Sequence, residues 1–418
     1  MAPSGMSTQP VPVASLADPA EVFDIILDPE RRGELYPYYH RLRELAPVHP
    51  TTALNNEQAF VLSRYQDIDG VLRNPHMFSD QRGAEIFNTG RSGEKFYRMM
   101  RRLLLYLDPP EHDRIRALLA RAFTPRAVEL RRPRIQQVVD DLLDQVEGRD
   151  SFDLVEDFAY PLPIVVICEM LGVPAEDLPR FYGWAHGFAR RGDVSDVTPE
   201  RIRVGEEATE GFRGYFLELI DECRKRPRDD LMTALVQLED EQGPISDEDL
   251  VASCVILLQA GHETTADLIG LGTLALLRNP DQLALLKRDP ELIEDAVEEL
   301  LRYDTSVQIS QRVGTEDLEL AGVTIPAGQV CVMITGAANR DPAVFPDPDR
   351  LDLTRRPRQH LSFGLGRHVC LGSSLARAEI HAAVGTLLRR RPELALAGEP
   401  EFRPSLFLRG LKSLPLTS

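Results

Sequence analysis

The sequence predicts a mainly helical protein with a small β portion, folded as a single domain. Hydrophobic residues recur with helical spacing almost throughout residues 111–304. Residues 305–335 alternate apolar and polar side chains around glycine turns, which is typical of short strands. The joints between helices are short, and no stretch is long enough for an interdomain linker. We therefore expect one domain over residues 21–418, preceded by a flexible leader at residues 1–20.

The composition excludes several classes of function. The chain has 418 residues, 43% of them hydrophobic, with 48 basic and 66 acidic side chains and a net charge of −18. Nucleic acid and anionic membranes are not expected partners of so acidic a chain. No membrane span or secretory signal is expected, so we predict a cytoplasmic protein. The five cysteines form no CxxC pair, which speaks against zinc ribbons and iron–sulfur clusters.

Both ends of the chain mix helix with other elements. A helix is expected over residues 34–45, and a strand over residues 59–63 leads into another helical stretch. Near the other end, residues 339–357 are rich in proline and aspartate and predict irregular structure. A glycine-rich loop and a final amphipathic helix over residues 371–389 follow.

A helix of about 30 residues is predicted between Ser246 and Asn279. Ser246 is a good N-cap followed by three acidic residues, and Asn279 precedes a proline. The helix would be about 45 Å long and is apolar nearly all round, so we expect it to cross the whole domain. Gly270 and Gly272 match a dinucleotide-binding fingerprint, but they lie inside this helix, so we reject a nicotinamide site.

A polar block interrupts the long helix at its midpoint, at residues 260–265. One interpretation is a solvated face or a packing kink, because buried Glu and Thr side chains are costly unless they are paired. The functional interpretation is that Gly261 lets a ligand approach the backbone, while Glu263 and Thr264 pass protons into a pocket.

A shorter helix begins near Asp289 and ends near Tyr303. On it, Glu299 and Arg302 are three residues apart and therefore neighbours on one face. Taken alone, this pair is typical of a surface ion pair worth less than about 1 kcal/mol.

The glycine-rich loop at residues 360–372 carries Cys370 just before the final helix. Backbone amides and the positive helix end would lower the pKa of this thiol. A cysteine in an intracellular protein is more often a buried, inert thiol. A single thiolate held by a rigid loop nevertheless suits haem iron, which takes one protein ligand.

The motif Phe363-Gly-x-Gly-x-His-x-Cys370-x-Gly372 resembles the haem-thiolate signature of the cytochrome P450 family. Five further matches lie in the family's order between residues 112 and 350, and their sequences are similar to those of the soluble bacterial members. They are His112-x-x-x-Arg116, Ala260-Gly-x-Glu-Thr-Thr265, Glu299-x-x-Arg302, Asn339-Arg-Asp-Pro342 and Phe345-Pro-Asp-Pro-Asp-Arg350.

The resemblance implies a cytochrome P450 fold, with haem b between the long central helix and the helix after the cysteine loop. Cys370 would ligate the iron, with Phe363 beside the sulfur. Basic side chains would bind the haem propionates, and small residues would line the haem. These are His112, Arg116, Arg312 and His368 for the propionates, and Gly364, Ala260 and Gly261 for the lining. Glu299, Arg302 and Arg350 would form a buried structural network behind the haem.

The family's reaction implies a monooxygenase that uses O2. Glu263 and Thr264 would organise water and deliver protons to reduced dioxygen. The resemblance favours hydroxylation, and also allows epoxidation, of a lipophilic molecule such as a polyketide, terpenoid, steroid or fatty acid. Two alternatives stay open: a non-hydroxylating oxidation such as phenol coupling or desaturation, and a catalytically silent haem protein that recruits a partner.

A local excess of positive charge points to an electron donor. Residues 114–134 contain seven arginines and one glutamate, a net +6, which leaves −24 for the rest of the chain. In this family the corresponding helix lies near the proximal haem face, where an acidic ferredoxin docks. We expect Arg121, Arg126, Arg131 or Arg132 to help steer a ferredoxin, itself reduced by its reductase, towards a monomeric enzyme. A solvated face is the plain alternative.

The substrate pocket is expected by analogy with the family, and the substrate itself stays open. The residues expected to line the pocket are mostly apolar, which suggests an apolar ligand of some size. They are Ile86, Phe87, Phe96, Ala260, Thr264, Val307, Gln308 and Phe407. Residues 82–102 also carry six basic side chains, which predict either a solvent-facing lid or a substrate with a carboxylate or polar tail.

Overall fold

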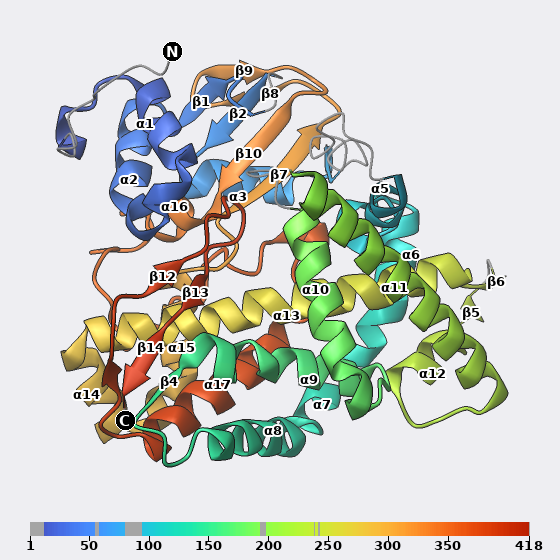
Figure 1. Cartoon of the computed structure of the whole chain (residues 1–418). Helices are drawn as coiled ribbons and strands as arrows, with labels where there is room; N and C mark the ends of the chain where they lie inside the picture. The colour runs from blue at the N-terminus through green and yellow to red at the C-terminus, as the bar shows by residue number, and fades with distance from the viewer. Residues whose placement is uncertain are drawn as a thin grey trace.

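Helices make up most of the computed structural model, which describes residues 12–54, 58–79, 94–192, 198–237, 239–240 and 243–417 (Figure 1). The predicted mainly helical class is confirmed. The helices are α1 Pro19–Leu27, α2 Leu35–Leu45, α3 Tyr65–Arg73, α5 Glu94–Met100, α6 Glu111–Ala120, α7 Pro125–Glu129, α8 Arg132–Gln145, α9 Pro161–Met170, α10 Leu178–Gly192, α11 Pro199–Lys225, α12 Leu231–Val236, α13 Asp247–Arg278, α14 Pro280–Arg288, α15 Ile293–Tyr303, α16 Thr335–Asn339 and α17 Ser373–Arg390.

The strands are short and gather mainly near the N-terminal helices. They are β1 Val48–Thr51, β2 Ala59–Leu62, β3 Met77–Phe78, β4 Ser151–Asp153, β5 Glu239–Asp240, β6 Gly243–Pro244, β7 Ile309–Gly314, β8 Leu318–Leu320, β9 Val323–Ile325, β10 Val330–Ile334, β11 Ala395–Leu396, β12 Glu401–Phe402, β13 Leu411–Ser413 and β14 Pro415–Thr417. The largest sheet has the order β1-β2-β10-β7-β3.

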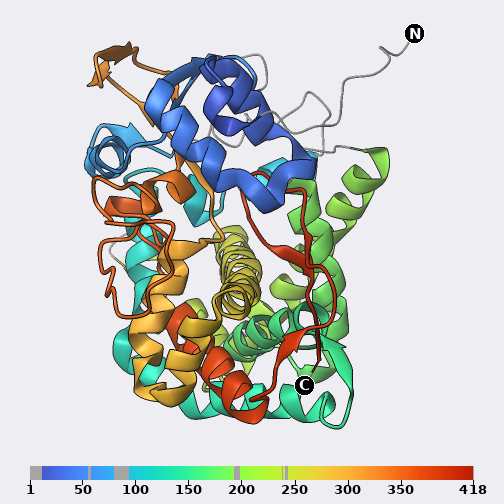
Figure 2. The same cartoon turned by 90° about the vertical axis from the view of Figure 1, so that its left-hand side faces the viewer.

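Helix α13 is the axis of the helical part of the molecule. Its N-cap is Ser246, whose hydroxyl accepts a hydrogen bond from the Asp249 amide at 3.2 Å. The helix has 32 residues, so it is about 48 Å long. Figure 2 shows it end-on, surrounded by other helices. Its side chains are buried at residues 250–258 and 265–276, as its apolar sequence predicts.

The largest sheet joins segments that are far apart in the sequence. Strand β10 pairs in parallel with β2 and antiparallel with β7, in a register that places Cys331 opposite Arg312. Alternate residues pack on its two faces, with Val61 and Val332 on one and Leu62 and Met333 on the other. The sheet therefore fixes the backbone of Arg312, on β7, beside β10.

The expected flexible leader at residues 1–20 needs a correction in its second half. Leu16 is 2% exposed and belongs to the same hydrophobic cluster as Val22 and Phe23. Its carbonyl oxygen accepts a hydrogen bond from Arg41 Nε at 2.7 Å. Apolar burial therefore ties residues 12–20 to α2, whereas residues 1–11 lie outside the described residues. Among the described helices, none is long and apolar enough to cross a membrane.

Candidate active site

The loop that carries Cys370 is shaped by two glycines in left-handed conformations. Gly364 has φ 64° and Gly366 has φ 67°, and a Cβ on Gly366 would collide with the Leu72 carbonyl oxygen. The Cys370 amide donates a hydrogen bond to the Phe363 carbonyl at 2.8 Å. The loop thus sets Cys370 just before α17.

Cys370 differs from the other four cysteines in its surroundings. It is exposed, whereas Cys168, Cys223, Cys254 and Cys331 are buried. The predicted lowering of the Cys370 pKa needs a correction. Desolvation is the largest influence and raises the pKa of this thiol above its ordinary value, although a Gly372 backbone hydrogen bond and the nearby charges of Arg116 and Arg377 act in the opposite direction. The Arg377 guanidinium also lies 4.4 Å from the centre of the Phe363 ring, which fixes that ring beside the loop.

The four basic residues predicted to bind propionates come together from three elements. Helix α6 supplies His112 and Arg116, strand β7 supplies Arg312, and the turn before Cys370 supplies His368. The ring centres of His112 and His368 are 4.2 Å apart. Arg116 donates to the Val369 carbonyl oxygen at 2.6 Å, which ties α6 to the cysteine loop.

The electrostatics of this basic cluster fit a dianionic ligand such as haem b. Burial, followed by repulsion from Arg312 and His112, lowers the pKa of His368 to about 2. Burial lowers the pKa of Arg312 to about 10. His112 Nε2 is buried and has no hydrogen-bond partner among the described residues. Two propionate carboxylates would supply the missing acceptor and offset this crowding of positive charge.

The midpoint of α13 is accessible, whereas most of the helix on either side of it is buried. Ala260 is exposed, and Gly261 and Thr264 are half-buried. A Cβ on Gly261 would meet no atom within 4 Å, so there is open space beside this residue. The Thr264 hydroxyl donates to the Ala260 carbonyl at 2.7 Å, which turns a helical carbonyl towards a side chain. The polar block is thus accessible, as its functional interpretation requires.

Glu263 is engaged on another side of the helix. Its carboxylate forms an ion pair with Arg403 Nη1 at 3.4 Å, and Arg403 also pairs with Asp267. Neither Arg403 nor Asp267 was expected from the sequence. Asp267 follows Glu263 by four residues and so shares its helix face, which is the one signal that could have indicated it. Arg403 is 140 residues away from Glu263, and no motif marks it.

The Glu299–Arg302 pair is fully buried and doubly hydrogen-bonded, at 2.7 and 2.8 Å. The predicted third member needs a correction. Arg350 is exposed and contributes its carbonyl oxygen, 3.4 Å from Arg302 Nη2, whereas Arg355 donates to Glu299 at 3.1 Å. The irregular chain turns between these two arginines, so spacing alone could not distinguish them.

The predicted pocket residues occupy different places. Phe96 is 1% exposed, with its ring centre 4.8 Å from that of Phe188. Val307 and Phe407 are half-buried near each other, because Val307 bridges to Leu408. Ile86 and Phe87 lie outside the described residues.

Gln308 needs a correction as a pocket residue. It is 1% exposed, accepts a hydrogen bond from the Tyr39 hydroxyl at 2.9 Å and donates to the Thr305 carbonyl at 2.6 Å. Successive side chains of an extended segment point to opposite sides, so Gln308 lies against α2 while Val307 does not. The side-chain amide of Gln308 is therefore engaged in hydrogen bonds inside the protein.

The basic residues of the expected lid are partly accounted for by ion pairs. Lys95 lies 3.3 Å from Glu210, and Arg102 lies 2.6 Å from Asp249. Both pairs are well exposed, which agrees with a solvent-facing role for these two side chains. Arg82 and Arg91 lie outside the described residues.

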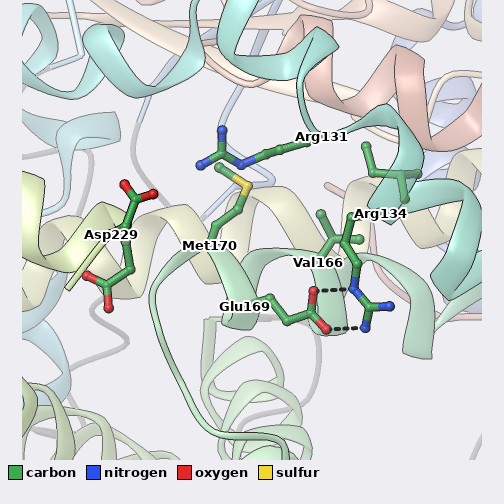
Figure 3. Close-up of a pocket in the computed structure, with 8 residues that line it drawn as sticks. Arg131, Arg134, Val166, Glu169, Met170 and Asp229 are labelled. Atoms are coloured by element: carbon green, nitrogen blue, oxygen red, sulfur yellow. Dashed lines mark hydrogen bonds and ion pairs between the residues drawn. The ribbon is translucent and has the colours of Figure 1, made fainter.

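The arginine-rich segment 114–134 presents an uneven surface. Arg121 and Arg126 are exposed, and Leu130 beside them is 75% exposed. Arg132 is paired with Glu129 at 2.6 Å. Arg131 donates to the Ala127 carbonyl and lines a separate surface pocket, in which Arg134 holds Glu169 by two hydrogen bonds (Figure 3). Arg121 and Arg126 are thus the more available of these charges.

Comparisons with known proteins agree with this geometry. A family model described as Cytochrome P450 matches residues 15–393. Cytochrome P450 CYP107DY1 from Priestia megaterium is 40% identical over 408 residues, covering 94% of this chain and 98% of that protein. The 6-deoxyerythronolide B hydroxylase of Saccharopolyspora erythraea is 39% identical over 391 residues, covering 91% and 95%. The structure of P450BioI with an acyl carrier protein ligated to hexadec-9Z-enoic acid has a TM-score of 0.86 at 36% identity, covering 93% and 99%.

Proposed function

Because the chain belongs to the cytochrome P450 family, it is a monooxygenase that holds haem b through a cysteine thiolate, and we propose that it hydroxylates a C–H bond of a lipophilic small molecule. The observation that carries this proposal is the open stretch at Ala260, Gly261 and Thr264, on a helix that is otherwise largely buried. Polar side chains in the middle of a buried helix are costly unless they are paired or face an open space, so this stretch fits a space for a ligand.

Bound haem b supplies the redox chemistry, namely the binding and reductive activation of O2. The chain's own residues hold and orient it. Cys370 would provide the thiolate ligand, and the Cys370–Phe363 backbone hydrogen bond holds the loop that carries it. His112, Arg116, Arg312 and His368 would bind the two propionates, which explains why basic side chains converge there.

Proton delivery is the proposed role of Glu263 and Thr264. Thr264 presents its hydroxyl at the open side of α13, where it can position water. Glu263 lies next to it in sequence and is 12% exposed, so its carboxyl can exchange protons with solvent. Product formation would then depend on the protons that these two residues hold and pass on.

The substrate class that we propose is a polyketide, a fatty acyl chain or another lipid-like molecule. The names of two relatives support it: one is a 6-deoxyerythronolide B hydroxylase, and the other was solved with a ligated hexadecenoic acid. In this chain, Ala260, Val307 and Phe407 are apolar residues that are not fully buried and stand near the proposed site in the family arrangement.

An 18O experiment tests hydroxylation directly. The holoenzyme is screened with a library of polyketides, steroids, terpenoids and fatty acids for the ferric spin-state shift, and hits are turned over under 18O2 with a surrogate ferredoxin and reductase. We expect one 18O atom in the product. Desaturated or coupled products without 18O would contradict hydroxylation, and no turnover of any bound hit would favour a silent haem protein.

We propose that the electron donor is an acidic ferredoxin in the cytoplasm, docking on Arg121 and Arg126. The exposed Leu130 beside them adds an apolar contact of the kind found at the centre of interfaces. Reversing both charges, as Arg121→Glu with Arg126→Glu, should lower the ferredoxin-supported rate and flatten its salt dependence. The matched control is Arg288→Glu at the exposed end of α14. Equal rates in both variants would contradict docking at this surface.

A further inference from the structure

Two carboxylates on α13 share one arginine. Arg403 follows strand β12, and its amide donates to the Gly410 carbonyl at 2.9 Å, which fixes the backbone on which the side chain stands. Its Nη1 pairs with Glu263 at 3.4 Å, and its Nη2 is hydrogen-bonded to Asp267 Oδ1. The guanidinium therefore bridges two consecutive turns of the helix, one of which carries the proposed proton donor.

Asp267 is held in place from several sides. Its side chain is 3% exposed, and its second oxygen, Oδ2, accepts a hydrogen bond from the Ser306 hydroxyl at 2.8 Å. Gly410 lies against both members of the pair, so that a Cβ there would overlap Asp267 and Arg403. Glu263 and Arg403 are more accessible, at 12% and 23%. Asp267 is thus the buried end of the cluster, and Glu263 is its more accessible end.

We propose that Arg403 and Asp267 are positioning residues that set how readily Glu263 leaves its ion pair to deliver protons. The inference rests on the proposed role of Glu263. Arg403 divides its hydrogen bonds between the two carboxylates. When Asp267 is ionised it competes for the guanidinium, which loosens Glu263; when Asp267 is neutral, this competition weakens and the ion pair between Arg403 and Glu263 tightens.

The surroundings of the cluster agree with an exchange near neutral pH. Burial raises the pKa of Asp267 to about 7, Arg403 lowers it, and Glu263 raises it again. The other titratable neighbours do not compete in this range. Burial lowers the pKa of His262 to about 3 and also lowers that of His186, while it raises the pKa of Tyr160 above its usual value.

Infrared spectroscopy of the ferric holoenzyme tests the coupling without turnover. We expect a protonated-carboxyl C=O band that titrates near pH 7 and is absent in Asp267→Asn. Glu263→Gln should move its midpoint down, because a neighbouring negative charge is lost. Arg403→Lys should move the midpoint up, since an ammonium point charge replaces the bidentate fork only in part. A band that ignores both substitutions would overturn the shared cluster.

Turnover then tests the consequence for Glu263. Asp267→Asn removes the competing negative charge, so Arg403 should hold Glu263 more tightly, and we expect product formed per NADPH to fall roughly threefold to tenfold and the solvent isotope effect on product formation to rise. The matched control is Asp304→Asn, which removes a carboxyl paired with Arg409 and Tyr36 at 2.7 Å and not linked to Glu263. In this control, the product formed per NADPH and the solvent isotope effect should both stay at their wild-type values.

The outcomes separate the two proposals. If Glu263→Gln leaves the solvent isotope effect at its wild-type value, then the proposed role of Glu263 is wrong. If Glu263→Gln changes it while Asp267→Asn and Arg403→Lys do not, only the positioning role is overturned. A variant that removes the charge of Arg403 could fail to fold, because Asp267 would be buried without a cation. Arg403→Lys keeps a cation beside Asp267, so this variant is expected to fold and the proposal can still be tested.

Discussion

Two clusters of charge in this molecule are built on opposite plans. Glu299 accepts hydrogen bonds from Arg302, Arg355 and the Asp352 amide, so each of its oxygens is matched by donors. In the other cluster, Glu263 and Asp267 divide one guanidinium between them. The first arrangement has one low-energy state and suits a structural role. The second shares one cation between two carboxylates, which suits a group that must exchange protons.

The largest expected effect comes from breaking the fully matched cluster. Arg302→Leu leaves Glu299 buried without its bidentate partner, so we expect the free energy of unfolding to fall by about 3–5 kcal/mol. Denaturant unfolding of the holoenzyme measures the loss, and the Soret absorbance per protein measures retained haem. A loss below about 1 kcal/mol would mean that the pair is not structural.

The shared cluster should show itself in the pH dependence of stability. The folded pKa of Asp267, about 7, is raised above its ordinary value, so the folded state binds a proton more tightly than the unfolded state does. Stability relative to Asp267→Asn should therefore be greatest below about pH 4 and fall as the pH rises towards 7. Between pH 5 and pH 8 we expect a relative loss of roughly 2–3 kcal/mol. Parallel curves for the two proteins would contradict the raised pKa.

A smaller effect distinguishes the two arginines near Glu299. Arg355→Ala removes a charged hydrogen bond to a buried carboxylate, which is expected to cost about 1.5–3 kcal/mol. Arg350→Ala removes an exposed side chain and keeps the carbonyl that Arg302 uses, so its cost should stay within about 0.5 kcal/mol. Thermal unfolding of both variants side by side gives the comparison, and the reverse order would restore Arg350 to the network.

The smallest effect is expected for an ion pair on the surface, in contrast to the buried pair of Glu299 and Arg302. Arg102 and Asp249 are 2.6 Å apart, but their side chains are 48% and 31% exposed. Arg102→Ala should cost less than about 1 kcal/mol, and the cost should shrink further in 1 M salt. Urea unfolding at low and high salt tests this, and a salt-independent loss above 2 kcal/mol would show a second role for Arg102.

The fold class was predictable because local rules carry it. Helical periodicity, the Ser246 N-cap and the stop at Asn279 act within a few residues, and α13 begins and ends where they indicate. The alternation of apolar and polar residues after Tyr303 likewise predicted strands there, and the structure has β7 and β10 in that segment. The packing of residues 12–20 was missed because the burial of Leu16 depends on α2, which lies outside any local window.

The candidate site was predictable only as far as its motifs extend. Cys370, His112 and Thr264 stand in patterns whose spacing is fixed by a loop or a helix turn. No such pattern marks Arg355 or the hydrogen bonds of Gln308. Both residues lie in irregular or extended segments, where a shift of one residue along the chain turns a side chain to the opposite side of the backbone.

The sequence by itself determined the family, the haem-thiolate chemistry and the long helix with its polar midpoint, because each depends on residues close together in the chain. Only the tertiary structure decided which cation holds Glu263. Arg403 reaches it across 140 residues, and Asp267 competes for the same guanidinium. Such pairing depends on how the C-terminal strands pack against α13, since electrostatic and hydrogen-bond partners are set by distance in space and not by distance along the chain.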